Sequence, residues 1–239
     1  MIDYSLSVII PAYNEENDIV ESVQANITTL NEFNINYEII IVNDGSTDNS
    51  LSLVESVFFN NKNVKTVSKT QNQGFGSAVK TGIQYCRKTH IIVVPVDSPL
   101  SINIYKCFHS HIGDADILVS YRKERKGYSL RMRFNSVFFH FLISNLFKLK
   151  LKDYNWIHLY SNIIFQEQKI EIKSNGIFML AEILIKSFWA KYTFFEFPVD
   201  HSERQNGIPT AASYNVALVT AYDTIIFYIK YLIKGPFFK

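Results

Sequence analysis

The sequence has few cysteines, few glycines and almost no net charge. Two cysteines, Cys86 and Cys107, are too few for the disulfide framework of a small secreted protein. With 24 Lys and Arg against 22 Asp and Glu, the net charge of +2 excludes the strong positive field of a typical nucleic-acid-binding protein. The first residues, MIDYSLSVII, lack the basic segment and cleavage site of a signal peptide. We therefore expect a cytoplasmic globular protein that has no nucleic acid as a partner.

Aromatic residues, by contrast, are abundant. Of the 239 residues, 47% are hydrophobic and 15% are aromatic, and the chain contains 19 Phe and 14 Tyr beside only 9 Gly. This apolar content is sufficient for one substantial core. The aromatic residues crowd into the second half of the chain, so they indicate a function there in addition to core packing.

The first 120 residues alternate short apolar, β-rich runs with helical patterns. This alternation predicts an α/β fold, in which helices flank a mostly parallel, Rossmann-like sheet. The expected strands are residues 6–10, 38–42, 64–68, 90–94 and 116–120. The expected helices are residues 16–30, 47–58, 74–86 and 101–111.

An uncharged, Phe-rich segment, residues 134–147, lies between two basic stretches. Six Lys or Arg and a single acid occur in residues 122–133, and Lys148, Lys150 and Lys152 follow the segment. Fourteen residues are too few to span a bilayer, but basic flanks and Phe suit a helix that lies among lipid headgroups. A buried core helix with basic ends is the alternative.

The C-terminal residues 216–234 repeat this combination of apolar and basic residues. At 100° per residue, Asp223, Lys230 and Lys234 share one side of a helix, and a broad apolar face lies opposite. The two charges at Asp223 and Lys230 argue against a membrane-spanning helix. We expect residues 213–239 to form an apolar helix that lies on a membrane, packs on its own domain or joins subunits.

Polar turns follow the first two expected strands. Residues 8–16 read VIIPAYNEE, and residues 42–50 read VNDGSTDNS. Either segment alone could be ordinary turn chemistry, since Asn, Asp, Gly and Ser dominate turns. Open α/β sheets, however, bind ligands at the carboxyl ends of their strands, so the joint spacing of the two segments predicts a ligand crevice.

These two segments resemble the signatures of family 2 glycosyltransferases, which have the GT-A fold. Further similar segments follow in the family's order: NQGFGSAVKTGI at 72–83, SYRKER at 120–125, KDYNWIHLY at 152–160 and ERQNGIPT at 203–210. This order is most similar to that of the polyprenyl- and dolichyl-phosphate sugar transferases. The resemblance implies a catalytic domain over residues 1–212, with a nucleotide-sugar half at 1–120 and an acceptor half at 121–212.

The resemblance also implies a nucleotide pocket. Its residues would be Pro11, Tyr13, Glu15, Val42, Asp44 and Val96. A carboxylate at a strand tip can accept a hydrogen bond from a base or a ribose hydroxyl, which suits Asp44. The alternatives are a packing aromatic for Tyr13 and a helix cap for Asp44.

After the fourth strand, the family usually has Asp-x-Asp, which binds a divalent cation and the donor diphosphate. This chain has Pro95, Val96 and Asp97, so only the last carboxylate is retained. One carboxylate with diphosphate oxygens and waters can hold Mg²⁺ or Mn²⁺. We therefore expect a metal at Asp97; a plain turn residue before Pro99 is the alternative.

Arginines form the next predicted group, since the guanidinium fork matches phosphate oxygens. The resemblance implies that Arg122 and Arg204 lie by the donor diphosphate, and that Arg131 or its neighbour Arg133 lies near the acceptor phosphate. Thr210 occupies a position where the family often has Lys. Solvated surface charges are the alternative.

Two acids are candidates for the acceptor side. Asp153 would orient the acceptor or act as a base, and Glu182, on an expected helix, is the second candidate unless it is solvated. Trp156, Ile157 and His158 replace the Gly-Phe-Arg that commonly follows in relatives. We expect altered acceptor or sugar recognition there, with His158 as a packed rather than a catalytic residue.

The resemblance implies inverting transfer of a sugar from a nucleotide sugar, with UDP favoured over GDP, to a polyprenyl phosphate. The enzyme would act at the cytoplasmic face of the membrane, peripherally attached, and a homo-oligomer would suit the same apolar helix. A lipid phosphate is already anionic and needs no strong base. Transfer to a glycan hydroxyl, which needs one, is the alternative, with Asp153 as first candidate. A scaffold with a decayed site is the third hypothesis.

Overall fold

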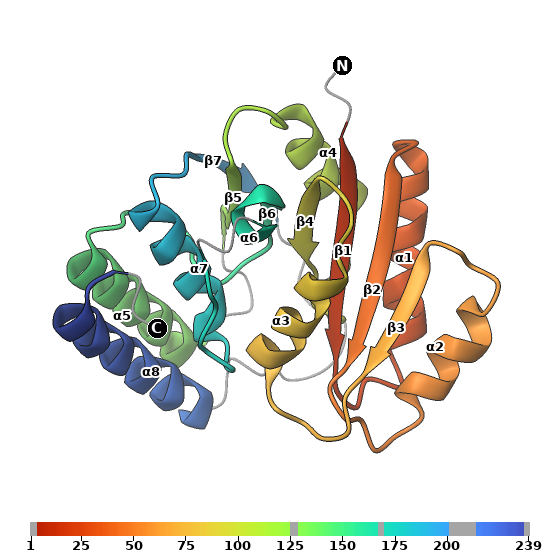
Figure 1. The fold of residues 1–239 in the computed structure, drawn as a ribbon, viewed down its shortest axis with the longest axis horizontal. Coiled ribbons are helices and arrows are strands. Elements are labelled where there is room, and N and C mark those ends of the chain that lie inside the picture. Colours follow the sequence, from red (N-terminus) through yellow and green to blue (C-terminus); the bar gives the residue numbers. More distant parts are fainter. Residues whose placement is uncertain (1–3, 125–128, 167–169, 201–213, 237–239) are drawn as a thin grey trace.

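The computed structural model describes residues 4–124, 129–166, 170–200 and 214–236 (Figure 1). The strands are β1 (Ser5–Ala12), β2 (Asn36–Asn43), β3 (Val64–Ser68), β4 (His90–Val93), β5 (Ile117–Arg122), β6 (His158–Ser161) and β7 (Phe194–Val199). The helices are α1 (Ile19–Glu32), α2 (Ser50–Phe58), α3 (Phe75–Tyr85), α4 (Ile102–Ser110), α5 (Leu130–Phe147), α6 (Ile163–Gln166), α7 (Phe178–Trp189) and α8 (Tyr214–Lys234).

The seven strands form one sheet in the order β3-β2-β1-β4-β6-β5-β7. All neighbouring pairs are parallel except those of β6, which runs antiparallel to β4 and to β5. The predicted α/β class with a mostly parallel sheet is therefore confirmed. The sequence pattern predicted no strand at β6 or β7, because both lie in the half of the chain that is dominated by aromatic residues.

Helices cover both faces of the sheet. Leu6, Val8 and Ile10 of β1 pack in one buried cluster with residues of α1, α2 and α4. Ile9 packs in a second cluster with residues of α3, α5, α7 and α8. Since neither face meets water, both sets of side chains are apolar, and the strand reads as a continuous hydrophobic run.

The helices α1 and α2 begin about one turn later than predicted. α1 starts at Ile19 instead of residue 16, and α2 starts at Ser50 instead of residue 47. The intervening residues bond the two preceding loops to each other: the Glu16 amide donates to Asp48 Oδ2 at 3.1 Å, and the Asn49 amide donates to Glu16 Oε2 at 3.0 Å. These loop-to-loop bonds replace the first turn of each predicted helix.

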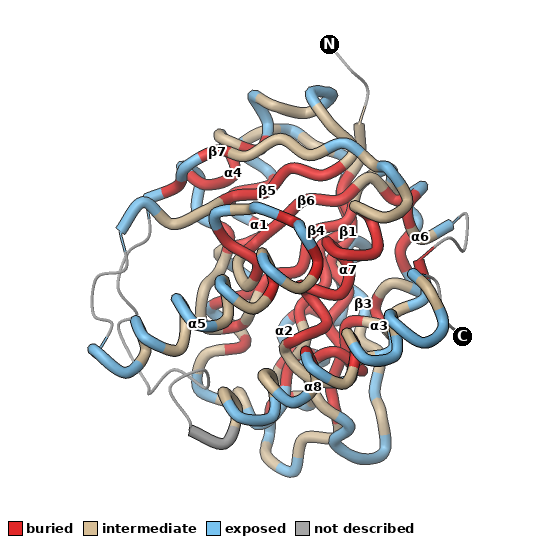
Figure 2. The backbone as a smooth tube through the Cα atoms, turned by 90° about the vertical axis from the view of Figure 1, so that its left-hand side faces the viewer, coloured by how far each residue is buried: buried red, intermediate tan, exposed pale blue. Residues whose placement is uncertain are grey.

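The Phe-rich segment is part of α5, which lies beside α8 (Figure 1). Only Ile143 and Phe147 of α5 are buried, so the alternative of a buried core helix is wrong. Phe147 contacts the rings of Phe227 and Tyr228 of α8, at centroid distances of 5.7 and 5.5 Å. Much of both helices is exposed on the side of the molecule that Figure 2 presents.

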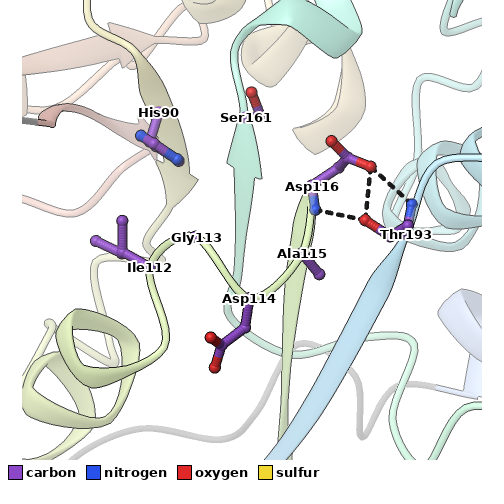
Figure 3. Close-up of a pocket in the computed structure, with 8 residues that line it drawn as sticks. All are labelled: His90, Ile112, Gly113, Asp114, Ala115, Asp116, Ser161 and Thr193. Carbon is purple, nitrogen blue, oxygen red and sulfur yellow. Dashed lines mark hydrogen bonds between the residues drawn. The ribbon is translucent and has the colours of Figure 1, made fainter. Parts of the chain in front are cut away.

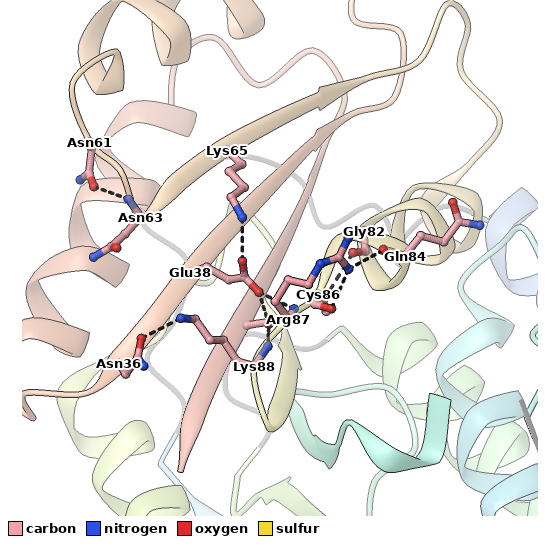
Figure 4. A network of polar contacts seen from close by, with 11 residues as sticks. Asn36, Glu38, Asn61, Asn63, Lys65, Gly82, Gln84, Cys86, Arg87 and Lys88 are labelled. Carbon is pink, nitrogen blue, oxygen red and sulfur yellow. Dashed lines mark hydrogen bonds and ion pairs between the residues drawn. The ribbon is translucent and has the colours of Figure 1, made fainter. Parts of the chain in front are cut away.

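Glu38 links the N-terminal ends of several strands, at the edge of the sheet opposite their carboxyl ends (Figure 4). Its buried carboxylate accepts from the Ser7 hydroxyl at 2.7 Å, the Arg87 amide at 2.6 Å and Lys65 Nζ at 3.0 Å. Burial alone would raise the pKa of Glu38, but these bonds lower it below its ordinary value. The ionised carboxylate therefore stabilises the fold.

We expect Glu38→Gln to lower the free energy of unfolding by about 2 kcal/mol at pH 7, because a buried donor loses its charged acceptor. Since the folded pKa is depressed, the contribution is present above the unfolded pKa of about 4.3 and is lost as pH falls through the folded value. Urea unfolding at pH 7 and below pH 4 measures both effects. Glu32→Gln, at an exposed position of α1, is the matched control. An unchanged stability at pH 7 would contradict the assignment.

Candidate functional site

The carboxyl ends of four parallel strands meet at one edge of the sheet. β1 and β2 end side by side, with Ala12 paired to Asn43, and β4 ends beside them, with Ile9 paired to Val93. β5 ends at the same edge with Arg122, and the antiparallel β6 begins there with His158. This edge therefore gathers the loops that carry most of the predicted site residues.

Two of these loops form the part of the edge next to β1. Pro11, Tyr13 and Glu15 follow one another at the end of β1, and the Glu15 amide donates to Ser50 Oγ at 2.7 Å. Gly45 (φ +74°) makes the turn after β2 so tightly that a Cβ there would lie 2.5 Å from the backbone of Gln71. Tyr13 is 44% exposed. Tyr13 is thus accessible to a ligand, and its contact with a nucleotide stays a prediction.

Asp44 is buried and engaged by protein groups. Its carboxylate accepts from Lys69 Nζ at 2.6 Å and from the Gln73 and Gly74 amides at 3.1 and 2.8 Å. These bonds tie the tip of β2 to the residues that lead into α3, where Gly74 is the N-cap. The contact of Asp44 with a nucleotide stays a prediction.

Two predicted pocket residues are members of the core. The side chains of Val42 and Val96 are 0% and 4% exposed. Asp97, beside Val96, lies half-buried in a turn directly after β4, which is closed by a 3.2 Å bond from the Ser98 amide to the Pro95 carbonyl. Asp97 thus places a carboxylate after β4 at this edge. The observed turn is also compatible with the alternative from the sequence, in which Asp97 is a plain turn residue before Pro99.

A divalent cation fits these residues only together with a substrate. Within the described ranges, no group of three or more His, Cys, Asp or Glu side chains forms a metal site. Mg²⁺ commonly takes one or two protein carboxylates and completes its shell with phosphate oxygens and waters. Asp97 meets that minimum, so a nucleotide diphosphate would have to supply the remaining charged oxygens.

Arg122 and Asp153 form a buried ion pair at the same edge. Nε and Nη2 of Arg122 lie 2.9 and 2.8 Å from Asp153 Oδ2, and the two side chains are 8% and 1% exposed. The guanidinium carbon also lies 4.6 Å from the ring centre of Trp156. Burial lowers the pKa of the neighbouring His158 to about 4, so its ring is neutral and packed, in accord with the sequence-based prediction.

Glu182 is fully buried on α7, so the alternative of a solvated helix position is wrong, and its role as an acceptor-side acid stays a prediction. Its carboxylate accepts from Lys186 Nζ at 2.7 Å and from the Lys173 and Ser174 amides at 2.8 Å each. Next to these amides, the Asn175 carbonyl accepts from the Gly76 amide at 2.7 Å. Glu182 thereby holds the segment that closes the N-terminus of α3.

Several structural partners were missed by sequence reasoning. The Lys186 side chain is paired to Glu182 in an i, i+4 arrangement within an otherwise apolar helix, and that spacing is a signal that could have identified it. Lys69 and Asn175 carry no such local signal, since their partners are distant in sequence. Arg131 and Arg133 are exposed in the first turn of α5, and Arg204 and Thr210 lie outside the described residues.

A shallow cavity of about 270 Å³ lies at the opposite edge of the sheet (Figure 3). It is lined by residues next to strand starts, among them His90, Asp116 and Thr193. The Asp116 carboxylate accepts from the Thr193 amide and hydroxyl at 2.8 and 2.7 Å. This cavity is therefore separate from the edge that carries the predicted site residues.

The profile of one protein family, described as Glycosyl transferase family 2, matches residues 7–165. The chain belongs to glycosyl transferase family 2. An uncharacterized glycosyltransferase of Synechocystis is 30% identical over 149 residues, which cover 61% of this chain and 46% of that protein. A dolichyl-phosphate beta-glucosyltransferase of Dictyostelium discoideum is 38% identical over 99 residues, 38% of this chain and 30% of that protein. The matched stretch spans less than half the length of each of these two relatives.

Solved structures share the fold of this family 2 chain. The crystal structure of glucosyl-3-phosphoglycerate synthase from Mycobacterium tuberculosis, solved with Mn²⁺, uridine diphosphate and glucosyl-3-phosphoglycerate, superimposes with a TM-score of 0.71. The alignment covers 95% of this chain and 79% of that one at 16% identity. The predicted GT-A fold is therefore confirmed.

Proposed function

We propose that this family 2 chain transfers a sugar from a nucleotide sugar, with UDP favoured, to a polyprenyl phosphate at the inner face of the cell membrane. Residues 1–120 would hold the donor, residues 121–212 the acceptor, and residues 213–239 the membrane. Support for the donor comes from Tyr13, Asp97 and Arg122 on one sheet edge and from the uridine diphosphate and Mn²⁺ of the mycobacterial neighbour. The name of the Dictyostelium relative supports a lipid phosphate acceptor.

One surface carries the proposal of a lipid acceptor, and we call it the apolar platform. Twelve of the eighteen large hydrophobic side chains exposed among the described residues lie on α5 and α8. The members on α5 are Leu130, Phe134, Val137, Phe138 and Phe141, and those on α8 are Leu218, Val219, Tyr222, Ile225, Ile229, Leu232 and Ile233. Exposed apolar patches of this kind mark membrane or protein contacts.

The packing of α8 favours a helix that lies on the membrane. Val216–Lys234 is long and apolar enough to cross a bilayer. Only 17% of its most apolar stretch is buried, so this helix is not a core helix of the domain. Trp189 of α7 stacks on Tyr231 and Phe227 at 4.6 and 5.9 Å, so one side of α8 is docked on the domain. Asp223 of α8 is half-buried, and this burial together with the nearby Glu182 of α7 raises its pKa. A docked side and an exposed apolar side suit an interfacial helix.

Basic residues at both ends of α5 add an electrostatic argument. Arg131 and Arg133 at its start and Lys148 and Lys150 after its end are all exposed. Each such charge near an anionic lipid surface contributes about 1 kcal/mol to binding. The platform with its basic ends therefore suits an anionic membrane, which is where a polyprenyl phosphate is found by virtue of its hydrocarbon chain.

The state of Asp153 favours a phosphate acceptor over a hydroxyl. Its Oδ2 receives two bonds from Arg122, and its Oδ1 receives the Asn155 amide at 3.2 Å. A carboxylate that is neutralised in this way is a poor proton acceptor, and a sugar hydroxyl would need one. A lipid phosphate attacks the anomeric carbon as an anion and needs no base.

The remaining residues would stabilise the departing diphosphate. Asp97 would hold Mg²⁺ or Mn²⁺ together with that group, and the ion supplies positive charge to the leaving oxygens. Arg122 would donate to diphosphate oxygens through its guanidinium fork. Such fixed charges lower the barrier as negative charge builds on the leaving group.

A transfer assay tests the proposal. The full chain is incubated with a panel of UDP- and GDP-sugars, with and without Mn²⁺, in vesicles that contain a polyprenyl phosphate or with a soluble glycan. We expect a lipid-extractable glycosylated product that requires both Mn²⁺ and the lipid phosphate. If product forms only with the soluble glycan, the acceptor is a hydroxyl group. If no product forms and no nucleotide binds, the protein is a non-catalytic scaffold.

A further inference from the structure

Trp156 lies in the loop between Asp153 and the start of β6, beside the last residue of β5. Two contacts fix this loop to β5: His158 pairs with Val119, and the Ser120 hydroxyl donates to the Ile157 carbonyl. The position of the Trp156 backbone relative to Arg122 is therefore set by the sheet itself.

The guanidinium of Arg122 contacts both a carboxylate and an aromatic ring. Asp153 takes the edge formed by Nε and Nη2, and the Trp156 ring lies 4.6 Å from the guanidinium carbon. A carboxylate that bonds one edge still permits the plane to tilt about that edge. Because the guanidinium carbon lies over the Trp156 ring, the ring limits this tilt, and the contact of the ring with the cation is itself favourable.

We propose that Trp156 is a positioning residue, which orients the Arg122 guanidinium for a nucleoside diphosphate. The proposal rests on the proposed function, because that function supplies the diphosphate. Planar recognition of phosphate oxygens requires the fork to be held in one plane, and a cation that is already ordered loses less entropy on binding.

A purely structural role for Trp156 makes a different prediction. The side chain is half-buried and also packs against the core cluster of β1, α1 and α4. If Trp156 contributed only to packing, its replacement would lower the stability of the protein. It would also weaken the binding of nucleosides and of nucleoside diphosphates to the same extent. The positioning role acts through Arg122 and affects only ligands that carry phosphates.

Calorimetric titration with UDP, GDP, uridine and guanosine separates the two roles. We expect Trp156→Leu to lower the affinity for the better-bound diphosphate about tenfold and to leave the affinity for the matching nucleoside unchanged. Trp156→Phe, which keeps a ring over the guanidinium, should stay within about threefold of the wild type. In an Arg122→Gln background, Trp156→Leu should have little further effect, since its partner is gone.

Three results would overturn the proposal: an unchanged diphosphate affinity in Trp156→Leu, an equal loss for the nucleoside, or additive effects in the double variant. If Trp156→Leu fails to fold in thermal unfolding, Trp156→Met, which also removes the ring and keeps a large apolar side chain, replaces it in the same titrations and in the Arg122→Gln cycle. A wild-type chain that binds neither UDP nor GDP would refute the proposed function and this inference together. If the wild type binds a diphosphate and the Trp156 variants bind it with the same affinity, only this inference is refuted.

Discussion

Asp97→Ala is expected to abolish sugar transfer, with a fall of about 10³-fold or more in kcat/KM. The half-buried carboxylate follows β4 at the edge that gathers the strand tips, and no larger metal-binding cluster exists in the described ranges. Within those ranges, therefore, no cluster of three or more such side chains could take over its role. The fold should persist, because the turn is closed by the backbone bond between Ser98 and Pro95.

The matched control is Asp114→Ala, an exposed carboxylate at the opposite edge of the sheet, which should keep full activity. Asp97→Asn retains the shape of the side chain and removes its charge, so it should lose activity nearly as fully and should abolish stimulation by Mn²⁺. Initial rates with the best donor, together with thermal unfolding of each variant, provide the measurement. Retained turnover in Asp97→Ala would refute the assigned role.

The double variant Phe141→Asp, Leu232→Asp is expected to weaken binding to anionic vesicles by about 100-fold or more. The two side chains are 61% and 62% exposed on the apolar platform. Each large apolar side chain that enters a membrane contributes about 1.5 to 3 kcal/mol, and a carboxylate adds repulsion from anionic lipids. Because both side chains are exposed, the substitutions should leave the stability of the domain nearly unchanged.

Phe59→Asp is the matched control, since Phe59 is 84% exposed at the end of α2 and lies outside the platform. Vesicle sedimentation at low and high salt measures the binding, and the wild type should bind less well at high salt. The emission of Trp189, recorded in a Trp156→Phe background, reports whether α8 stays docked. The alternative outcome is a wild-type protein that does not bind vesicles and forms an oligomer, with a double variant that is monomeric. That result would identify the platform as a subunit interface.

Much of the site could be predicted from the sequence because its chemistry follows the strand ends. A β-rich apolar run followed by a polar turn identified the tips of β1 and β2, and the segment before Asp97 identified that of β4. The positions of β1 to β5 depend on local order along the chain and were correct to within a few residues, whereas β6 and β7 were not predicted. Helix starts were less predictable, because Glu16, Asp48 and Asn49 bond across two loops that are distant in sequence.

By itself, the sequence determined the α/β class, the family and the edge of the sheet that carries the polar residues, since all three depend on short motifs and periodicity. Only the tertiary structure decided which polar groups are already engaged by protein: Asp44 with Lys69, Asp153 with Arg122, and Glu182 with Lys186. It also decided that the apolar sides of α5 and α8 face outward. The physical reason is the same in each case: a local pattern specifies what a side chain can bind, but the packing of elements that are distant in sequence selects the partner.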